Sequence, residues 1–256
     1  MAEFTPMMQQ YLQTKEEYKD CILFYRLGDF YEMFFEDAEL VSKELELTLT
    51  GKNCGMEERA PMCGIPYHAV EGYLNKLVAN GHKVAICEQV EDPKLAKGLV
   101  RREVIRIVTP GTNLDMQALD ESKNNYIMCI VYLADRYGVS IADVSTGDYY
   151  VTEVDSERKL FDEITKFSPS EIICNESFYM SGVDIEDLRH RLKITIYALE
   201  TWYFGDELAE TTLLTHFKVK SLEALGLADY DCGMIAAGAL LKYLYETQKN
   251  DLNNIS

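Results

Sequence analysis

The sequence predicts an α/β protein made of two domains. At 256 residues the chain is long enough for two domains of ordinary size. Apolar runs typical of strands and segments with helical periodicity occur along its whole length. Between them lies a polar stretch, 110–125, in which both periodicities stop. Hydrophobic residues make up 47% of the chain and charged residues 27%, which is typical of globular proteins.

In the first domain, expected over 1–115, helices and strands do not alternate regularly. Its first helix is expected over 7–18, with Thr5 and Pro6 as the N-cap and the first helical position. The irregular order favours a mixed α+β sheet over a parallel one. The other expected elements are strands over 21–27, 47–50, 83–90 and 100–109, helices over 31–45 and 67–80, and a loop over 51–64.

The most informative stretch is the junction between the first strand and the second helix. Gly28 ends the strand, and Asp29 is a suitable N-cap for the helix. Phe30 then lies at the corner, with Glu32 two residues later. An aromatic ring beside a carboxylate suits recognition of a displaced nucleic-acid base, because the ring stacks and the carboxylate bonds a base edge.

Each of these residues also has an ordinary structural explanation. Aromatic residues in strands and helices most often pack in the core. Phe30 and Phe34 are four residues apart and would form one stripe of the expected helix. Glu32 would lie at N3 of that helix, where a capping box places glutamate. The residues alone leave both explanations open.

A second domain is expected over 126–247, after a linker over 116–125. Three strands joined by short turns come first, over 126–134, 138–143 and 147–154. Helices and strands then alternate, an order that suits an RNase-H-like α/β layout. The later expected elements are helices over 160–167, 185–192, 206–216 and 232–248 and strands over 171–174 and 194–198.

The formal net charge of −18 is unfavourable for binding DNA, because attraction to phosphates normally dominates DNA affinity. Residues 1–115 carry 13 Lys and Arg against 19 Asp and Glu, whereas residues 116–256 carry 12 against 24. The acidity is therefore concentrated in the second half. A basic strip remains in the first half, although such a run is more often a solvated face than a binding site. The strip contains Lys94, Lys97, Arg101, Arg102 and Arg106.

Residue spacing argues against several classes of protein. Seven cysteines without a Cys-x-x-Cys pair favour a reducing cytoplasm and argue against a disulfide framework or a zinc site. The four histidines have no metal-ligand spacing, so neither a metal nor a catalytic residue is expected. The chain has no P-loop motif. It also has no apolar run long enough to span a membrane and no N-terminal signal pattern.

Five sequence blocks carry a family resemblance. They are Thr-Pro-Met-Met-Gln-Gln-Tyr at 5–11, Gly-Asp-Phe-Tyr-Glu at 28–32, Pro-Met-Cys-Gly-Ile-Pro-Tyr-His-Ala at 61–69, Val-Ala-Ile-Cys-Glu-Gln-Val at 84–90 and Arg-Ile-Val-Thr-Pro-Gly-Thr at 106–112. In this order they resemble the MutS family of bacterial DNA mismatch-repair sensors. The resemblance implies an N-terminal fragment with a mismatch-recognition domain, an RNase-H-like connector domain and, over 248–256, the start of a core or lever domain.

The resemblance also implies roles for individual residues. Phe30 would enter from the minor groove and stack on a mispaired or unpaired base of kinked duplex DNA, and Glu32 would bond that base. Unstacking costs about a few kcal/mol, and least where pairing is already poor. The candidate contacts with the DNA backbone are Lys52, Arg59, His68, Arg101, Arg102 and Arg106.

Other implied properties belong to a longer protein. Full-length family members are ATPases that use ATP and Mg²⁺ in a further domain, and they form homodimers. Their connector domain is implicated in contacting MutL and in relaying the ATP state. For this chain we expect no enzyme activity, no cofactor and no membrane contact. We expect a cytoplasmic location at the bacterial nucleoid, and a monomer is compatible with the fragment.

Other functions stay open beside this one. The acidic second domain would suit a protein-interaction module, and a MutS paralogue would act on other DNA structures. An RNase-H-like nuclease would hold two metal ions with carboxylates, for which Asp143 at a strand end is the best candidate. Asp135, Asp148 and Glu153 lie nearby in sequence. Carboxylates in an acidic domain more often serve turns and surfaces.

Overall fold

The computed structural model describes residues 3–115 and 123–256, and the chain divides into two compact units. Unit 1 comprises Met1–Thr109 and unit 2 comprises Pro110–Ser256. The division therefore falls before the linker expected over 116–125, of which residues 116–122 lie outside the described residues. Both units combine helices with a mixed sheet, so the predicted α/β class is confirmed.

Unit 1 is built on a six-stranded mixed sheet with the strand order β3-β4-β2-β1-β5-β6. β1 and β5 run parallel, and the other neighbouring strands pair in antiparallel fashion. The strands are β1 (Ile22–Leu27), β2 (Phe30–Phe34), β3 (Thr50–Lys52), β4 (Ala60–Pro66), β5 (Val84–Gln89) and β6 (Arg102–Val108).

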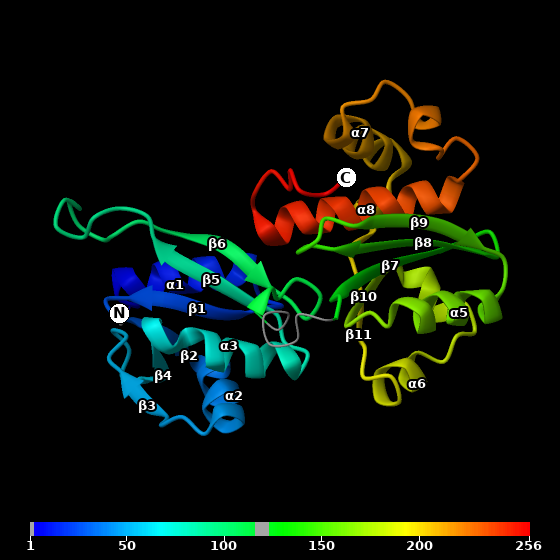
Figure 1. The fold of residues 1–256 in the computed structure, drawn as a ribbon. Helices are drawn as coiled ribbons and strands as arrows, with labels where there is room; N and C mark the ends of the chain where they lie inside the picture. Colours follow the sequence, from blue (N-terminus) through cyan, green and yellow to red (C-terminus); the bar gives the residue numbers. More distant parts are fainter. Residues whose placement is uncertain (1–2, 116–122) are drawn as a thin grey trace. The chain divides into compact units, whose positions relative to one another are not determined.

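Helices cover both faces of this sheet (Figure 1). α1 (Pro6–Glu17) packs on one face, and Thr5 caps it as expected, with its hydroxyl accepting a hydrogen bond from the Met8 amide at 3.4 Å. α2 (Phe35–Leu45) and α3 (Val70–Ala79) pack on the other face. A single 3₁₀ turn, η1 (Tyr67–Ala69), joins β4 to α3.

The junction after β1 is a β-hairpin. Leu27 pairs with Phe30, so Gly28 and Asp29 form a two-residue turn. Gly28 has a φ of +59°, and a glycine in the first turn position is typical of type II′ hairpins. β2 continues to Phe34. Along this strand, successive side chains face opposite sides of the sheet.

The helix expected over 31–45 is therefore wrong over 31–34 and begins at Phe35. Glu32 does not occupy a capping box, and Phe30 does not share a helical stripe with Phe34. The cause is tertiary, because β2 hydrogen-bonds to β1 on one side and to β4 on the other. The loop expected over 51–64 is wrong for the same reason, since its second half forms β4.

Unit 2 contains a five-stranded sheet with the order β11-β10-β7-β8-β9. β7, β8 and β9 form an antiparallel meander, and β10 and β11 add parallel to β7. This order agrees with the expected RNase-H-like layout, in which three strands joined by short turns are followed by alternating helices and strands. The strands are β7 (Tyr126–Leu133), β8 (Arg136–Asp143), β9 (Tyr149–Val154), β10 (Glu171–Cys174) and β11 (Thr195–Ala198).

The helices of unit 2 lie in two layers, one on each face of its sheet (Figure 1). The longest of them is α8 (Asp231–Gln248), which is buried along most of its length. Gly138 on β8 permits its close approach, because a Cβ there would lie 2.1 Å from the Cys232 carbonyl oxygen. One layer holds α5 (Glu157–Phe167) and α6 (Ile185–His190), and the other holds α7 (Asp206–Phe217) and α8 (Asp231–Gln248). Short 3₁₀ segments are η2 (Glu176–Met180), η3 (Thr201–Phe204) and η4 (Leu222–Leu225).

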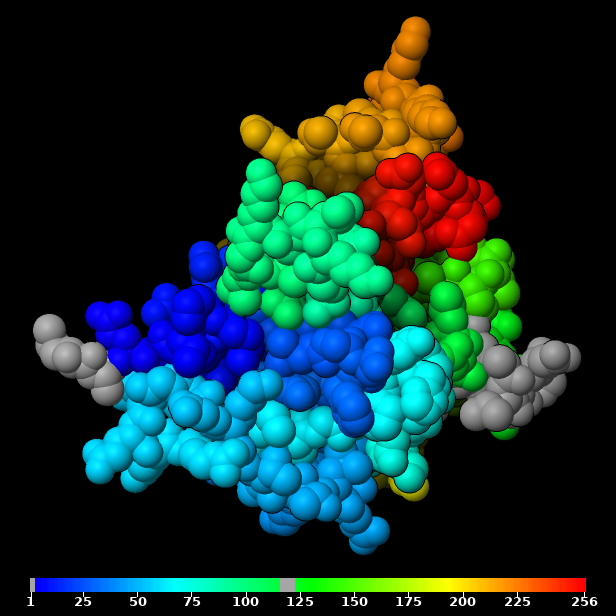
Figure 2. All heavy atoms as spheres, turned by 90° about the vertical axis from the view of Figure 1, so that its left-hand side faces the viewer, coloured from blue at the N-terminus to red at the C-terminus, as the bar shows by residue number. Residues whose placement is uncertain are grey.

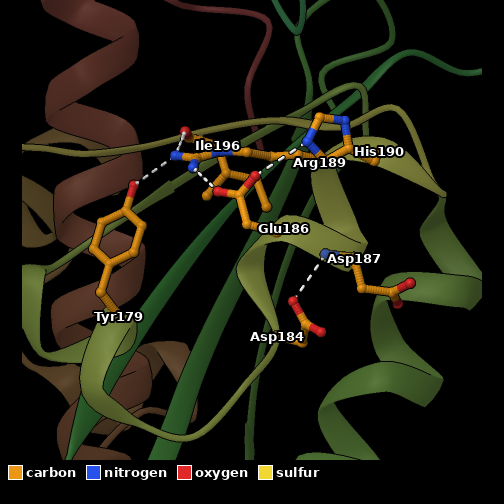
Figure 3. A network of polar contacts seen from close by, with 7 residues as sticks. All are labelled: Tyr179, Asp184, Glu186, Asp187, Arg189, His190 and Ile196. Carbon is orange, nitrogen blue, oxygen red and sulfur yellow. Dashed lines mark hydrogen bonds and ion pairs between the residues drawn. The ribbon is translucent and has the colours of Figure 1, made fainter.

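Polar contacts from α6 cover the outer edge strand β11 (Figure 3). The Arg189 guanidinium donates to the Ile196 carbonyl oxygen at 3.0 Å and to the Tyr179 hydroxyl at 3.3 Å. Glu186 holds the same guanidinium at 2.6 Å. Exposed edge strands invite pairing with other chains, and this arginine occupies one carbonyl of that edge.

The C-terminal residues pack on unit 2. They were expected to start a further domain over 248–256, but Leu252 and Ile255 are buried in the core beside α8. The Asn254 side chain donates to the Val144 carbonyl oxygen at 2.7 Å, at the turn between β8 and β9. This packing makes the segment part of unit 2.

All seven cysteines are buried. Burial raises the pKa of the Cys63 thiol to about 11, so it behaves as a small apolar side chain. Among residues 3–115 and 123–256, no helix is long and apolar enough to cross a membrane.

Buried polar contacts fix the start of unit 2 to its sheet. Glu171 on β10 has no exposed surface and accepts hydrogen bonds from the Gly111 amide at 2.8 Å and the Tyr243 hydroxyl at 2.7 Å. The Tyr197 hydroxyl also donates to this carboxylate. Such a carboxylate stabilises the fold because each of its donors would otherwise be buried without a partner.

We predict that Glu171→Ala lowers the free energy of unfolding of unit 2 by about 3 kcal/mol, because it leaves buried donors unsatisfied. Glu171→Gln keeps an acceptor and should cost about 1 kcal/mol. Urea denaturation followed by the fluorescence of Trp202, the single tryptophan, measures both variants in unit 2. Equal stabilities of Glu171→Ala and the unmodified chain would contradict the assigned role.

Candidate nucleic-acid interface

Phe30 and Glu32 project from the same face of β2, because they are two residues apart in a strand. On the neighbouring strand β4, Pro66 lies opposite Phe30 and Gly64 lies opposite Glu32. A Cβ at Gly64 would lie 3.6 Å from the Phe30 ring and 3.7 Å from the Glu32 Cγ. The two side chains therefore flank a position that has no side chain of its own.

Phe30 differs in its exposure from the aromatic residues of β1 and from Phe34 of its own strand. The ring of Phe34 is buried against Tyr11 of α1, with ring centroids 4.8 Å apart. Phe24 and Tyr25 have no exposed surface, whereas Phe30 is 44% exposed. Core packing therefore explains the buried aromatics, and Phe30 remains as a surface aromatic at the start of its strand.

Glu32 is held by a cation from a different strand. The Nζ of Lys52, on β3, lies 3.1 Å from Oε2 of Glu32. The Glu32 side chain is only 17% exposed, and that of Lys52 is 34% exposed. Because β4 separates β3 from β2, this pair spans three strands of the sheet.

Arg26 holds the turn before Phe30 from the opposite face of the sheet. Its Nε donates to the Gly28 carbonyl oxygen at 2.6 Å, and its Nη1 lies 3.3 Å from Glu88. The guanidinium stacks 4.1 Å from the ring centroid of Tyr67. The Tyr67 amide in turn donates to the Asp29 carbonyl oxygen at 2.9 Å. These contacts fix the hairpin turn and hence the base of the Phe30 side chain.

The hydroxyl of Tyr31 joins the same network by donating to Glu88. Burial and this carboxylate raise the pKa of Tyr31, so the hydroxyl stays a donor at neutral pH.

The basic strip lies away from Phe30 within unit 1. Its arginines are on β6 or directly before it, and β1 and β5 separate β6 from β2. Arg102 makes internal contacts, with its Nε donating to the Arg26 carbonyl oxygen and its Nη1 to the Gln10 side chain, both at 2.8 Å. Arg101 is exposed and lies 3.8 Å from Glu103, and Arg106 is partly buried. The segment that joins β5 to β6 extends beyond the ends of both strands in Figure 1 and faces the viewer in Figure 2 (blue-green).

The remaining candidate residues flank β4. His68 follows the end of β4 in η1, and its ring meets the Tyr67 ring edge-on with centroids 5.9 Å apart. Arg59 directly precedes β4 and packs along Gly51 of β3, where a Cβ would lie 3.2 Å from the Arg59 Cβ. His68 therefore lies at the Phe30 end of β4, and Arg59 lies at the Lys52 end.

The carboxylates considered as nuclease ligands have structural contacts in unit 2. Asp143 is buried and caps the β8–β9 turn by accepting from the Ser145 amide at 2.9 Å and its hydroxyl at 2.7 Å. Glu153 accepts from the Gly233 amide at 2.8 Å. Asp135 accepts from Tyr132, and Asp148 from the Thr146 hydroxyl, at 2.8 and 2.9 Å. In the described part of the chain, no group of three or more His, Cys, Asp or Glu side chains is placed to hold a metal ion.

Family models match both units. The model for MutS domain I matches residues 5–117, and the model for MutS domain II matches residues 125–256. The chain belongs to the MutS family.

Similar proteins carry the name DNA mismatch repair protein MutS. The protein from Lachnoclostridium phytofermentans is 66% identical over the whole chain, and that from Acetivibrio thermocellus is 53% identical. The Clostridium tetani protein is 50% identical over 99% of the chain. The chain spans 28% to 29% of the length of these curated relatives. The family resemblance deduced from the sequence blocks is therefore confirmed.

Sequence reasoning missed the residues that support the site. Arg26, Tyr67 and Glu88 meet only through the fold, since Arg26 and Glu88 are 62 positions apart. The pairing of Lys52 with Glu32 was not expected either, although both residues were singled out. A single charged residue in an otherwise apolar strand was the local signal for Arg26, and it does not indicate which residues this side chain contacts.

We predict that Arg26→Leu loosens the hairpin turn, because the Gly28 carbonyl and Glu88 lose their common donor. Hydrogen exchange of the Tyr67 amide should accelerate by about tenfold, equivalent to about 1.4 kcal/mol of local opening free energy. Arg26→Lys retains a cation for Glu88 and should give an intermediate rate.

The matched control for this measurement is Arg101→Leu, which removes an exposed arginine of the same unit. Unchanged exchange of the Tyr67 amide in Arg26→Leu would show that the turn does not depend on Arg26.

Proposed function

We propose that this chain contributes the recognition of mispaired or unpaired bases to DNA mismatch repair, with Phe30 as an aromatic wedge. The observation that carries the proposal is the exposed Phe30 ring beside Glu32 and Gly64, on a hairpin fixed from behind by Arg26. The names of the similar proteins support the same process.

The wedge discriminates by the cost of deforming DNA. Insertion of Phe30 from the minor groove kinks the duplex and unstacks a base step, which costs about a few kcal/mol. Stacking of one base on an aromatic ring stabilises the complex by about 1–3 kcal/mol. A mispaired or unpaired base has less pairing to lose than a paired one, so the balance favours defective sites. This mechanism needs no reading of base sequence.

Glu32 supplies the polar contact to the displaced base. Its carboxylate oxygens are hydrogen-bond acceptors, and exposed base edges carry N–H donors. Gly64, opposite Glu32 on β4, adds no side chain that would cover the carboxylate on that side, so a base edge can approach the carboxylate while the face of the base meets the ring.

Basic residues around the wedge would contact the DNA backbone. Arg59 and His68 flank β4, while Arg101 and Arg106 lie towards the β6 edge of the sheet. Arg102 would contribute least, since its donors already hold β1 and α1. The net charge of −18 opposes DNA binding, so we expect the affinity of this chain to be low and to fall steeply with salt.

Unit 2 would act as a connector that relays to protein partners. Its acidic surface disfavours DNA and suits contact with a protein. This chain covers 28% and 29% of the length of the two relatives named first, and in such a longer protein we propose that ATP, Mg²⁺ and the homodimer contacts are provided outside residues 1–256. MutL is the partner we propose for unit 2.

The wedge is tested by fluorescence anisotropy at low salt, with one duplex containing an unpaired thymine and a fully paired control. The unmodified chain should prefer the unpaired base, and Phe30→Ala should lose about 5- to 100-fold in affinity for it, as expected from one lost stacking contact. Binding to the paired control should change little.

The matched control is Leu40→Ala, which removes another exposed apolar side chain, from α2 on the opposite face of the sheet. The proposal fails if the chain binds both duplexes equally, or if Phe30→Ala and Leu40→Ala behave alike.

A further inference from the structure

We propose that Lys52 is a positioning residue that orients and neutralises Glu32, so that the carboxylate accepts a hydrogen bond from a displaced base. This inference rests on the proposed function, because it concerns the same site. In this proposal Lys52 acts on the Glu32 carboxylate and does not itself bind a DNA phosphate.

The first support is geometric. Lys52 Nζ lies 3.1 Å from Oε2 of Glu32, which fixes one of the two carboxylate oxygens. A carboxylate has two oxygens and about four acceptor positions, so Oε1 retains the capacity to accept from another donor. Lys52 therefore selects one orientation of the Glu32 side chain before DNA arrives.

The second support is the position of the pair in the sheet. Lys52 lies on β3, at the edge of the sheet, whereas Glu32 lies on β2, and Gly64, the residue of β4 opposite Glu32, has no side chain. The ammonium also lies 5.9 Å from the ring centroid of Phe34, which is buried. A cation over an aromatic face is favourably placed, and this contact holds Lys52 near the site.

The third support is electrostatic. A carboxylate that is 17% exposed and faces DNA phosphates would repel the duplex if it stood alone. With Lys52 attached, the pair has no net charge, so this repulsion is removed for paired and mispaired DNA alike. A displaced base then adds a hydrogen bond that a paired base does not offer. Lys52 thus lets Glu32 distinguish a displaced base from a paired one, with little loss of affinity for DNA.

The two possible roles of Lys52 predict different results for combined substitutions. A phosphate contact acts independently of Glu32, so its loss costs the same whether position 32 carries Glu or Gln. A positioning residue acts through the carboxylate, so its loss matters much less when Gln, which has no charge to neutralise, replaces Glu32.

The test is a double-mutant cycle in the full chain, built from Lys52→Met, Glu32→Gln and the double variant. Anisotropy is measured with the duplex containing an unpaired thymine and with the paired control. Lys52→Met should weaken binding to the unpaired-base duplex about tenfold with Glu32 present, and threefold or less in the Glu32→Gln background. Lys52→Arg should restore most of the binding, because a guanidinium also pairs with a carboxylate.

Lys76→Met is the matched control, since it removes a lysine of the same unit from α3 on the opposite face of the sheet. Equal costs of Lys52→Met in both backgrounds, or failure of Lys52→Arg to restore binding, would overturn the inference and leave the Phe30-dependent preference intact. If the unmodified chain shows no preference for the unpaired base, the proposed function fails, and this inference fails with it.

Discussion

The pairing of β2 between β1 and β4 is the constraint on which the site in unit 1 depends. The register places Phe30 opposite Leu27 on one side and Pro66 on the other. A shift of one residue would turn Phe30 and Glu32 towards the face covered by α2 and α3 and expose the alternate residues of the strand instead. The two-residue turn at Gly28, held by Arg26, fixes this register close to Phe30.

The fold was predictable where each element carries its own local signal. The strand 171–174 has the expected bounds, and the helices expected over 206–216 and 232–248 differ from α7 and α8 by one residue. The first turn of the helix expected over 31–45 was not predictable, because its conformation depends on hydrogen bonds from β4, about thirty residues later in the chain. The residues of 28–34 by themselves are compatible with either a strand or the first turn of a helix.

The site was predictable in part. The local sequence after Gly28 and the family resemblance singled out Phe30 and Glu32, and the structure adds that Phe30 is exposed while Phe24, Tyr25 and Phe34 are buried. The contacts that support these residues join strands far apart in sequence, as in the pair of Lys52 with Glu32. A sequence gives the identity of charged residues, but their partners follow from strand order, which the irregular succession of elements in unit 1 did not reveal.

The most direct test of the central claim is photochemical cross-linking of the wedge to the base that it contacts. A duplex carries 5-iododeoxyuridine either mispaired opposite guanine or paired opposite adenine, and cross-linked peptides are identified by mass spectrometry. We predict a cross-link to Phe30 that forms with the mispaired base and is much weaker with the paired one. Cross-links confined to residues 101–106, or equal in both duplexes, would contradict the account.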